Sequence, residues 1–167
     1  VGIRPWPEDF EATQIASEKR SKRMDEMMEI INGRLTGEYF EYKGEIFDLA
    51  SIKLTPTPAF HVPLLVGGHA KPALRRAARL GDGWIAAGGK IDEYKTMIDT
   101  INEFRKEYGR DHLPFQIQAM SHDSFSVDGL MQLHAIGVTE VIIAFRDVYG
   151  KEADDKSVEE KTQMINW

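Results

Sequence analysis

The chain has 167 residues, a length that suits one domain with a sizeable core, and no cysteine, which excludes disulfides, thiolate nucleophiles and cysteine-ligated metals. Apolar residues make up 42% and charged residues 29%, so a folded domain is favoured over disorder. The net charge is −6, with 13 basic and 12 acidic side chains in residues 1–90 against 8 and 15 in residues 91–167. Without a basic stripe or an apolar run of about 20 residues, nucleic acid and membrane are not expected partners.

The N-terminal sequence VGIRPWPEDF has neither the basic region nor the apolar region of a secretory signal. It also lacks a starting methionine, which indicates a fragment or a processed piece. The absence of cysteine fits a reducing compartment. We therefore expect a cytoplasmic protein.

The first third of the chain predicts a helix followed by a hairpin. Residues 10–32 are expected to form one long helix that ends at Asn32-Gly33, and the charge run 17–26 is expected to lie on a solvated or inter-helix face. Its apolar stripe, with helical spacing typical of core packing, consists of Met24, Met27, Met28 and Ile31. Residues 39–48 predict a hairpin that turns at Lys43-Gly44, and a proline-rich extended connector follows it.

From Pro63 onward, strand and helix patterns alternate. The expected strands are 64–66, 83–87, 115–120 and 141–145, and the expected helices are 72–80, 91–108, 126–136 and 157–167. Ser157 and Glu160 form a capping box at the start of the last helix. Alternation at this spacing indicates an α/β fold with a parallel sheet. A closed eightfold barrel needs about 250 residues, so the chain is either an open α/β sheet or roughly half a barrel.

The most informative loop follows the first of these strands. Gly67-Gly68 ends the strand, and a helix begins near Pro72. Such a turn points the free amides of the helix N-terminus at a ligand above the strand end, where they bind phosphate, and Lys71 adds a positive charge. The spacing matches neither a Walker motif nor G-x-G-x-x-G, and an ordinary tight turn is the alternative.

Other polar residues give weaker signals. The three arginines of the next helix are expected on a solvated face, and Asp82 is expected to bond backbone amides in a turn. His122-Asp123 follows the third strand and is expected to be structural. A metal site is not supported, because no metal-ligand spacing occurs among His61, His69, His112, His122 and His134. A serine hydrolase site has no support either, because no G-x-S-x-G occurs.

The order of short motifs along nearly the whole chain resembles the bacterial luciferase-like monooxygenase family. These motifs are Arg20…Asp25-Glu26, Tyr42-x-Gly44 with Phe47, Pro56-x-Pro58, Pro63-x-x-Val66-Gly67-Gly68, Ala77-Ala78-Arg79-Leu80-Gly81-Asp82-Gly83-Trp84, Gly109-Arg110 and Gly137-Val138-Thr139-Glu140-Val141. The family groups flavin-dependent monooxygenases with reductases and dehydrogenases that use the deazaflavin F420. Its fold is a (β/α)8 TIM barrel. The resemblance implies that residues 1–167 are the C-terminal half of such a barrel, with strands five to eight preceded by a helix and the hairpin, and that Val1-Gly2 ends strand four.

The resemblance also implies a function. It predicts an oxidoreductase that uses FMN or F420 on a small organic substrate. The implied cofactor-binding residues are Gly67, Gly68, His69 and Ala70 in the phosphate loop, with Lys71, and Gly2 near the cofactor ring. No catalytic residue is assigned, because the family's positioning groups come largely from the absent first strands.

Two alternatives remain on the same scaffold. One is a non-catalytic flavin- or phosphate-binding protein, and the other is a structural fragment without a ligand. We expect the 167-residue chain alone to be inactive, because part of the catalytic site is missing. We also expect it to form a homo-oligomer, because its strand edges are open.

Overall fold

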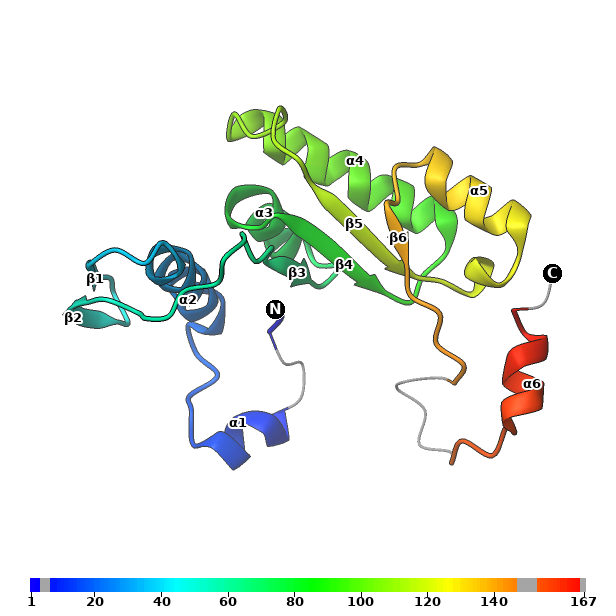
Figure 1. The fold of residues 1–167 in the computed structure, drawn as a ribbon, viewed down its shortest axis with the longest axis horizontal. Coiled ribbons are helices and arrows are strands. Elements are labelled where there is room, and N and C mark those ends of the chain that lie inside the picture. The colour runs from blue at the N-terminus through cyan, green and yellow to red at the C-terminus, as the bar shows by residue number, and fades with distance from the viewer. Residues whose placement is uncertain (4–6, 147–152, 166–167) are drawn as a thin grey trace.

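The computed structural model describes residues 1–3, 7–146 and 153–165, shown as a ribbon in Figure 1. Its main body is a parallel sheet of β3 (Leu65–Gly67), β4 (Gly83–Ala87), β5 (Gln116–Met120) and β6 (Glu140–Val141), with neighbouring strands in chain order. The helices between the strands are α3 (Lys71–Leu80), α4 (Ile91–Glu107) and α5 (Val127–Ala135), and the short helix η1 (His122–Phe125) precedes α5. The expected alternation of strands and helices in a parallel sheet is confirmed.

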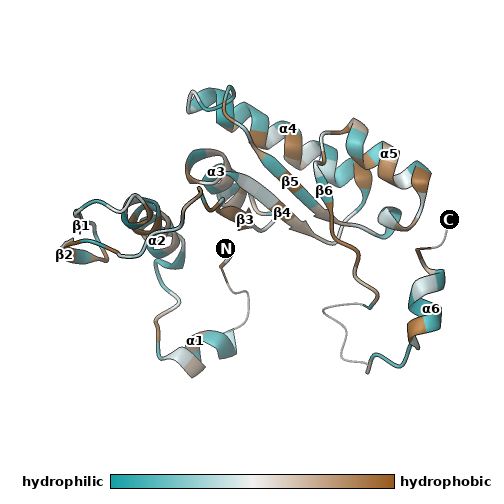
Figure 2. Cartoon of the chain, viewed as in Figure 1, coloured by the Kyte–Doolittle hydropathy of each residue, from teal (hydrophilic) through white to brown (hydrophobic). Residues whose placement is uncertain are grey.

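The helices cover one face of this sheet. Alternate strand residues, among them Val66, Trp84 and Ile117, are buried, whereas their neighbours Ile85 and Gln118 are only half-buried. Because successive side chains of a strand point to opposite faces, the core lies between the strands and α3 to α5. The hydropathy colouring in Figure 2 shows apolar residues on both the strands and the helices that pack against them. Among the described elements, α3 to α5 leave the other face of the sheet open (Figure 1).

The expected first helix is wrong in its extent. The structure has two helices here, α1 (Pro7–Thr13) and α2 (Arg20–Leu35), and Gln14 and Lys19 between them have positive φ angles of 54° and 57°. The apolar stripe begins only at Met24, so residues 14–19 have no continuous apolar face to hold a helix against the core. Met28 is fully buried, as a core residue should be, while Met27 is 41% exposed.

The expected helix stop at Asn32-Gly33 is also wrong. Helix α2 continues to Leu35. A side chain at Gly33 would collide with the ring of Phe40, so this glycine permits the hairpin to approach the helix closely.

A buried carboxylate joins α2 to the hairpin of β1 (Phe40–Lys43) and β2 (Asp48–Ile52). Glu26 is fully buried and accepts hydrogen bonds from the backbone amides of Glu45, Ile46 and Phe47 at 2.8, 3.1 and 3.0 Å. The hairpin is therefore confirmed, but its connection spans residues 44–47 and is organised by a residue of the charge run.

The arginines of α3 do not share one solvated face. Arg76 is only 4% exposed; its Nε donates to the Asp25 carboxylate and its Nη2 to the Ser21 carbonyl at 3.0 Å. Arg79 donates to the same carboxylate at 3.0 Å. Only Arg75 matches the expectation, since it is exposed and bonds Glu107 and Tyr108 at 3.0 Å each. The expectation is wrong for Arg76, because α2 packs across this face of α3.

The C-terminal part is shorter than expected. Strand β6 covers two residues, against the expected 141–145, and α6 covers Val158–Gln163. The capping box of Ser157 and Glu160 is confirmed. The expected helix end at 166–167 lies outside the described residues. None of the described helices is both long and apolar enough to cross a bilayer.

Candidate functional site

A cavity lies at the C-terminal end of β3, where the sequence predicts a phosphate loop. We call it the loop cavity, and its volume is about 380 Å³. It is lined by Ile3, Arg20, Ser21, Gly67, Gly68, His69, Ala70, Pro72, Ala73 and Arg76. The strand end, the first turn of α3 and the first turn of α2 therefore form its walls. Four of the six predicted cofactor-binding residues meet here.

The backbone at Gly68 gives the loop its shape. Gly68 has a φ of +119°, and a Cβ atom there would lie 3.0 Å from the Cβ of Ala73. The buried Trp84 of β4 donates from Nε1 to the Gly68 carbonyl at 2.8 Å. A glycine is therefore required for both conformation and space, and the core fixes the loop from below.

The N-terminus of α3 presents unpaired amides to this cavity. Ala70 is the N-cap residue and makes no side-chain cap, while the amides of Ala73 and Leu74 are satisfied by the Ala70 carbonyl at 2.8 and 3.2 Å. Within the described residues, the amides of His69, Ala70 and Lys71 donate to no backbone carbonyl. Free amides and the positive end of a ten-residue helix together favour an anion.

Two arginines outside the predicted loop also line the cavity. Arg20 is exposed, and its guanidinium carbon lies 5.9 Å from the Phe10 ring centroid. Arg76 is occupied by Asp25 and Ser21, so it positions the first turn of α2 beside the loop. Sequence reasoning missed both as site residues, because no local spacing shows that α2 returns to the end of β3. The motif order that begins at Arg20 was the one available signal.

The remaining predicted residues lie elsewhere. The Lys71 ammonium lies 5.9 Å from the Phe104 ring centroid on α4, and Lys71 does not line the loop cavity. Gly2 lines an adjoining, mostly apolar cavity of about 250 Å³, which shares Ile3 and Arg20 with the loop cavity.

Val1 lies beside β3 as a parallel strand neighbour would. Its nitrogen donates to the Leu65 carbonyl at 2.6 Å, and the Gly67 amide donates to the Val1 carbonyl at 2.7 Å. This alternation of bonds is the pattern of a parallel ladder. It places Gly2 at the same end of the sheet as the phosphate loop.

Aromatic groups beneath the loop are structural. The rings of His69 and Trp84 have centroids 6.0 Å apart, and Tyr94 meets Trp84 edge-on at 6.3 Å. Tyr94 donates to the Met120 carbonyl at 2.6 Å. Burial, together with the nearby charges of Asp123 and Glu93, raises the pKa of Tyr94 to about 12. Tyr94 therefore stays protonated at neutral pH.

Two other candidates, Asp82 and Asp123, have structural surroundings. Asp82 accepts a hydrogen bond from the Leu64 amide at 2.9 Å, as expected for a turn residue. Asp123, next to His122, bonds the hydroxyl of Ser121 and helps to organise η1. Among the described residues, no three histidine or acidic side chains are grouped as metal ligands would be.

Comparison with known proteins identifies the family. The sequence model of luciferase-like monooxygenases matches residues 3–125. The chain belongs to the luciferase-like monooxygenase family. The matched range includes every residue that lines the loop cavity, from Ile3 to Arg76.

Individual relatives support this membership. An uncharacterized protein of Mycobacterium tuberculosis is 46% identical over 165 residues, which cover 99% of this chain and 57% of that protein. Pyrimidine monooxygenase RutA of Allorhizobium ampelinum is 29% identical over 66% of this chain and 29% of its own length. The chain thus spans only about half, or less, of the length of the curated relatives it matches.

A solved structure confirms the fold class. The coenzyme F420 dependent tetrahydromethanopterin reductase of Methanopyrus kandleri superposes with a TM-score of 0.71 at 12% identity, over 98% of this chain and 70% of that one. At this identity the likeness concerns the fold alone. The α/β architecture with a parallel, barrel-type sheet is that of this family.

Proposed function

We propose that the protein is an oxidoreductase that uses FMN or coenzyme F420 to act on a small organic molecule, and that the loop cavity binds the cofactor's phosphate. Family membership supports the reaction type, and relatives named as a monooxygenase and as an F420-dependent glucose-6-phosphate dehydrogenase support both cofactors. The observation that carries the proposal is the loop cavity itself. Unpaired amides, a required glycine and an arginine converge there at the end of a parallel strand.

The residues fit a phosphate by their chemistry. The amides of His69 to Lys71 donate to oxyanion oxygens, and the absent side chain at Gly68 leaves room for them. Arg20 supplies a guanidinium fork, which matches phosphate geometry. Bound FMN or F420 would supply the hydride or electron transfer, and the protein would supply binding and orientation. Lys71 acts at most through its backbone amide, because its side chain lies over Phe104.

We further propose that the chain forms the C-terminal half of a barrel, with β3 to β6 as strands five to eight. The parallel ladder between Val1 and β3 supports this, because it adds a strand neighbour on the side where strand four would lie. The open sheet face also supports it. Half of a barrel site lacks the groups that orient substrate, so the chain alone is predicted to show no turnover. Its cytoplasmic location and self-association remain predictions as well.

A fluorescence titration with FMN, and separately with F420, tests the proposal. We expect saturable binding of at least one cofactor by the wild-type chain. We expect phosphate-free riboflavin to bind much more weakly than FMN, because only FMN reaches the amides. Equal binding of riboflavin and FMN would remove the loop cavity from the site. Binding without turnover in a full-length relative would favour the non-catalytic alternative.

A further inference from the structure

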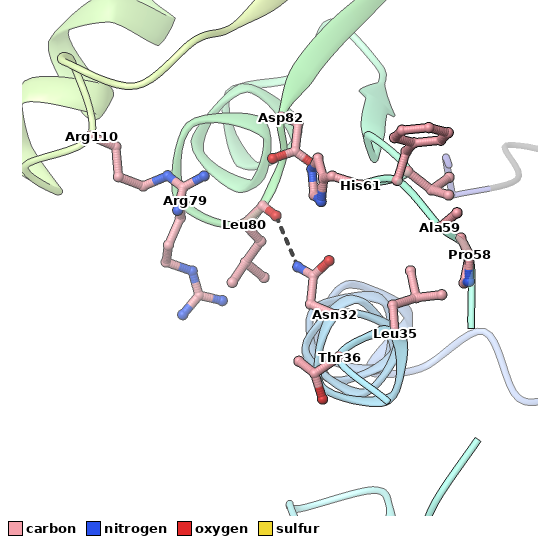
Figure 3. Close-up of a pocket in the computed structure, with 12 residues that line it drawn as sticks. Asn32, Leu35, Thr36, Pro58, Ala59, His61, Arg79, Leu80, Asp82 and Arg110 are labelled. Carbon is pink, nitrogen blue, oxygen red and sulfur yellow. Dashed lines mark hydrogen bonds and ion pairs between the residues drawn. The ribbon is translucent and has the colours of Figure 1, made fainter. Parts of the chain in front are cut away.

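A second and larger cavity lies at the opposite end of the strands. It is formed where the connector 58–62, the ends of α2 and α3, and the segments before β4 and β5 meet, and we call it the connector cavity (Figure 3). Its volume is about 480 Å³, within the range of small-molecule pockets. It shares no residue with the loop cavity. Its location at the N-terminal ends of the strands separates it from the proposed cofactor site.

Arg110 is the cationic group of this cavity that lacks a countercharge. One of its nitrogens donates to the Gly81 carbonyl at 3.0 Å, and no carboxylate of the described residues lies within ion-pair distance of it. A guanidinium has five N–H donors. Arg110 is half-buried and therefore keeps donors that can reach a further acceptor in the cavity.

The other charges near Arg110 do not neutralise it. Asp82 lines the cavity, but its carboxylate already accepts from the Leu64 amide at 2.9 Å and lies 3.1 Å from His61 Nε2. Arg79 adds a second guanidinium on the cavity wall, but it pairs with Asp25 at 3.0 Å and Glu29 at 3.8 Å, neither of which lines the cavity. The buried Arg105 donates hydrogen bonds to two carbonyls of the loop after α4. Burial, together with the charge of Arg110, lowers the pKa of Arg105.

The rest of the lining suits a flat apolar body. Phe60 is 87% exposed and stands at the cavity, with Val62, Leu35 and Leu80 also lining it. Asn32 donates to the Leu80 carbonyl at 3.4 Å, which ties α2 to α3 across the cavity. Stacking on the ring of a ligand would cover the exposed ring of Phe60.

We propose that the connector cavity binds a small aromatic anion, with Arg110 holding its carboxylate or phosphate and Phe60 contacting its ring. Both oxyanions match the planar guanidinium fork. The site is distinct from the loop cavity and does not depend on the function proposed above.

Amide-resolved NMR titration of the protein tests the proposal, with benzoate, phenyl phosphate and neutral benzamide as probes. We expect benzoate or phenyl phosphate to cause saturable shifts at residues 79–82 and 110, and benzamide to cause none. The stronger anion identifies the oxyanion that the cavity prefers. Mapping by residue separates this site from anion binding at residues 67–71.

Substitutions decide which groups act. Arg110→Gln is expected to weaken binding at least about tenfold, because a charge-assisted hydrogen bond is lost. Arg110→Lys, which keeps the charge and the fold, should recover only part of that loss. Arg75→Gln is the control for Arg110→Gln: it also removes one guanidinium, but Arg75 pairs with Glu107 and does not line the cavity. Phe60→Ala should weaken phenyl phosphate while leaving inorganic phosphate unchanged.

Three results would overturn the proposal. These are no saturable shift with either anion, equal binding of benzamide, and unchanged affinity in both Arg110 variants.

Discussion

The two cavities at opposite ends of β3 are built in different ways. The loop cavity consists largely of backbone amides and small residues contiguous in sequence, with Gly68 at its centre. The connector cavity consists of side chains from segments up to 78 residues apart, from Asn32 to Arg110. In barrel folds the C-terminal ends of strands carry the reaction site, and the N-terminal ends usually serve stability. A local motif could therefore predict the first cavity, whereas only the folded chain brings the second together.

The largest expected effect concerns the loop cavity. Gly68→Val should abolish measurable cofactor binding, because valine is strained at a φ of +119° and its Cβ would crowd Ala73. Titration of FMN and F420 measures the loss. Gly109→Val is the control, since Gly109 has a φ of +64° in open space at the end of α4. Thermal melting checks that both variants fold. If the folded Gly68→Val variant keeps the cofactor affinity of the wild type, the loop cavity is not the cofactor site.

The next effect concerns the wall of α2 that completes the loop cavity. Asp25→Ala should cost about 3–5 kcal/mol of unfolding free energy, because it leaves the buried guanidinium of Arg76 without its carboxylate. Arg75→Gln, which breaks an exposed ion pair, should cost far less. Chemical denaturation compares them. Equal costs for the two substitutions would show that the Asp25–Arg76 pair does not hold α2 on α3.

Glu26 lies on α2 and lines neither cavity. The pH dependence of stability tests how this residue holds the hairpin against α2. Burial raises the pKa of the Glu26 carboxyl, but the three amides of the hairpin turn outweigh it, and the pKa lies below its ordinary value of 4.5. A depressed folded pKa contributes stability that is present above pH 4.5 and is lost as pH falls through the folded pKa.

Glu26→Gln should therefore lower stability at neutral pH and flatten the loss of stability on acidification. Urea unfolding across this pH range measures both. The exposed Glu38→Gln serves as the control. A wild-type and a Glu26→Gln curve with the same pH slope would contradict the assignment.

The smallest expected effect concerns the open face of the sheet. Ile85 and Met120 are half-buried there, and β6 is an edge strand that can pair with another chain. We expect the chain to self-associate at tens of micromolar, as sedimentation velocity would show. A monomer with cooperative unfolding would count against the half-barrel assignment.

The accuracy of the sequence-based predictions follows the range of the interactions. Strand 83–87 has the predicted bounds, because a continuous apolar run between glycine turns specifies it locally. The phosphate loop is contiguous, so its glycines could be found. The break between α1 and α2 has no glycine or proline to mark it.

Long-range burial could not be read from the sequence. Arg76 and Glu26 look like solvent-facing charges, and their burial depends on partners 51 and 19 to 21 residues away. The sequence shows that these two residues are charged. Only the folded chain shows that they are buried and which groups they contact. The connector cavity escaped notice for the same reason.

Phosphorus NMR of FMN bound to the protein tests the central claim most directly, because it reports the surroundings of the phosphate itself. Free amides and Arg20 at the loop cavity should shift and broaden the phosphorus resonance on addition of the wild-type chain. The same resonance should stay at its free position with Gly68→Val and shift normally with Gly109→Val. An FMN that binds with an unperturbed phosphorus resonance, or one that Gly68→Val leaves shifted, would contradict the assignment of the loop cavity.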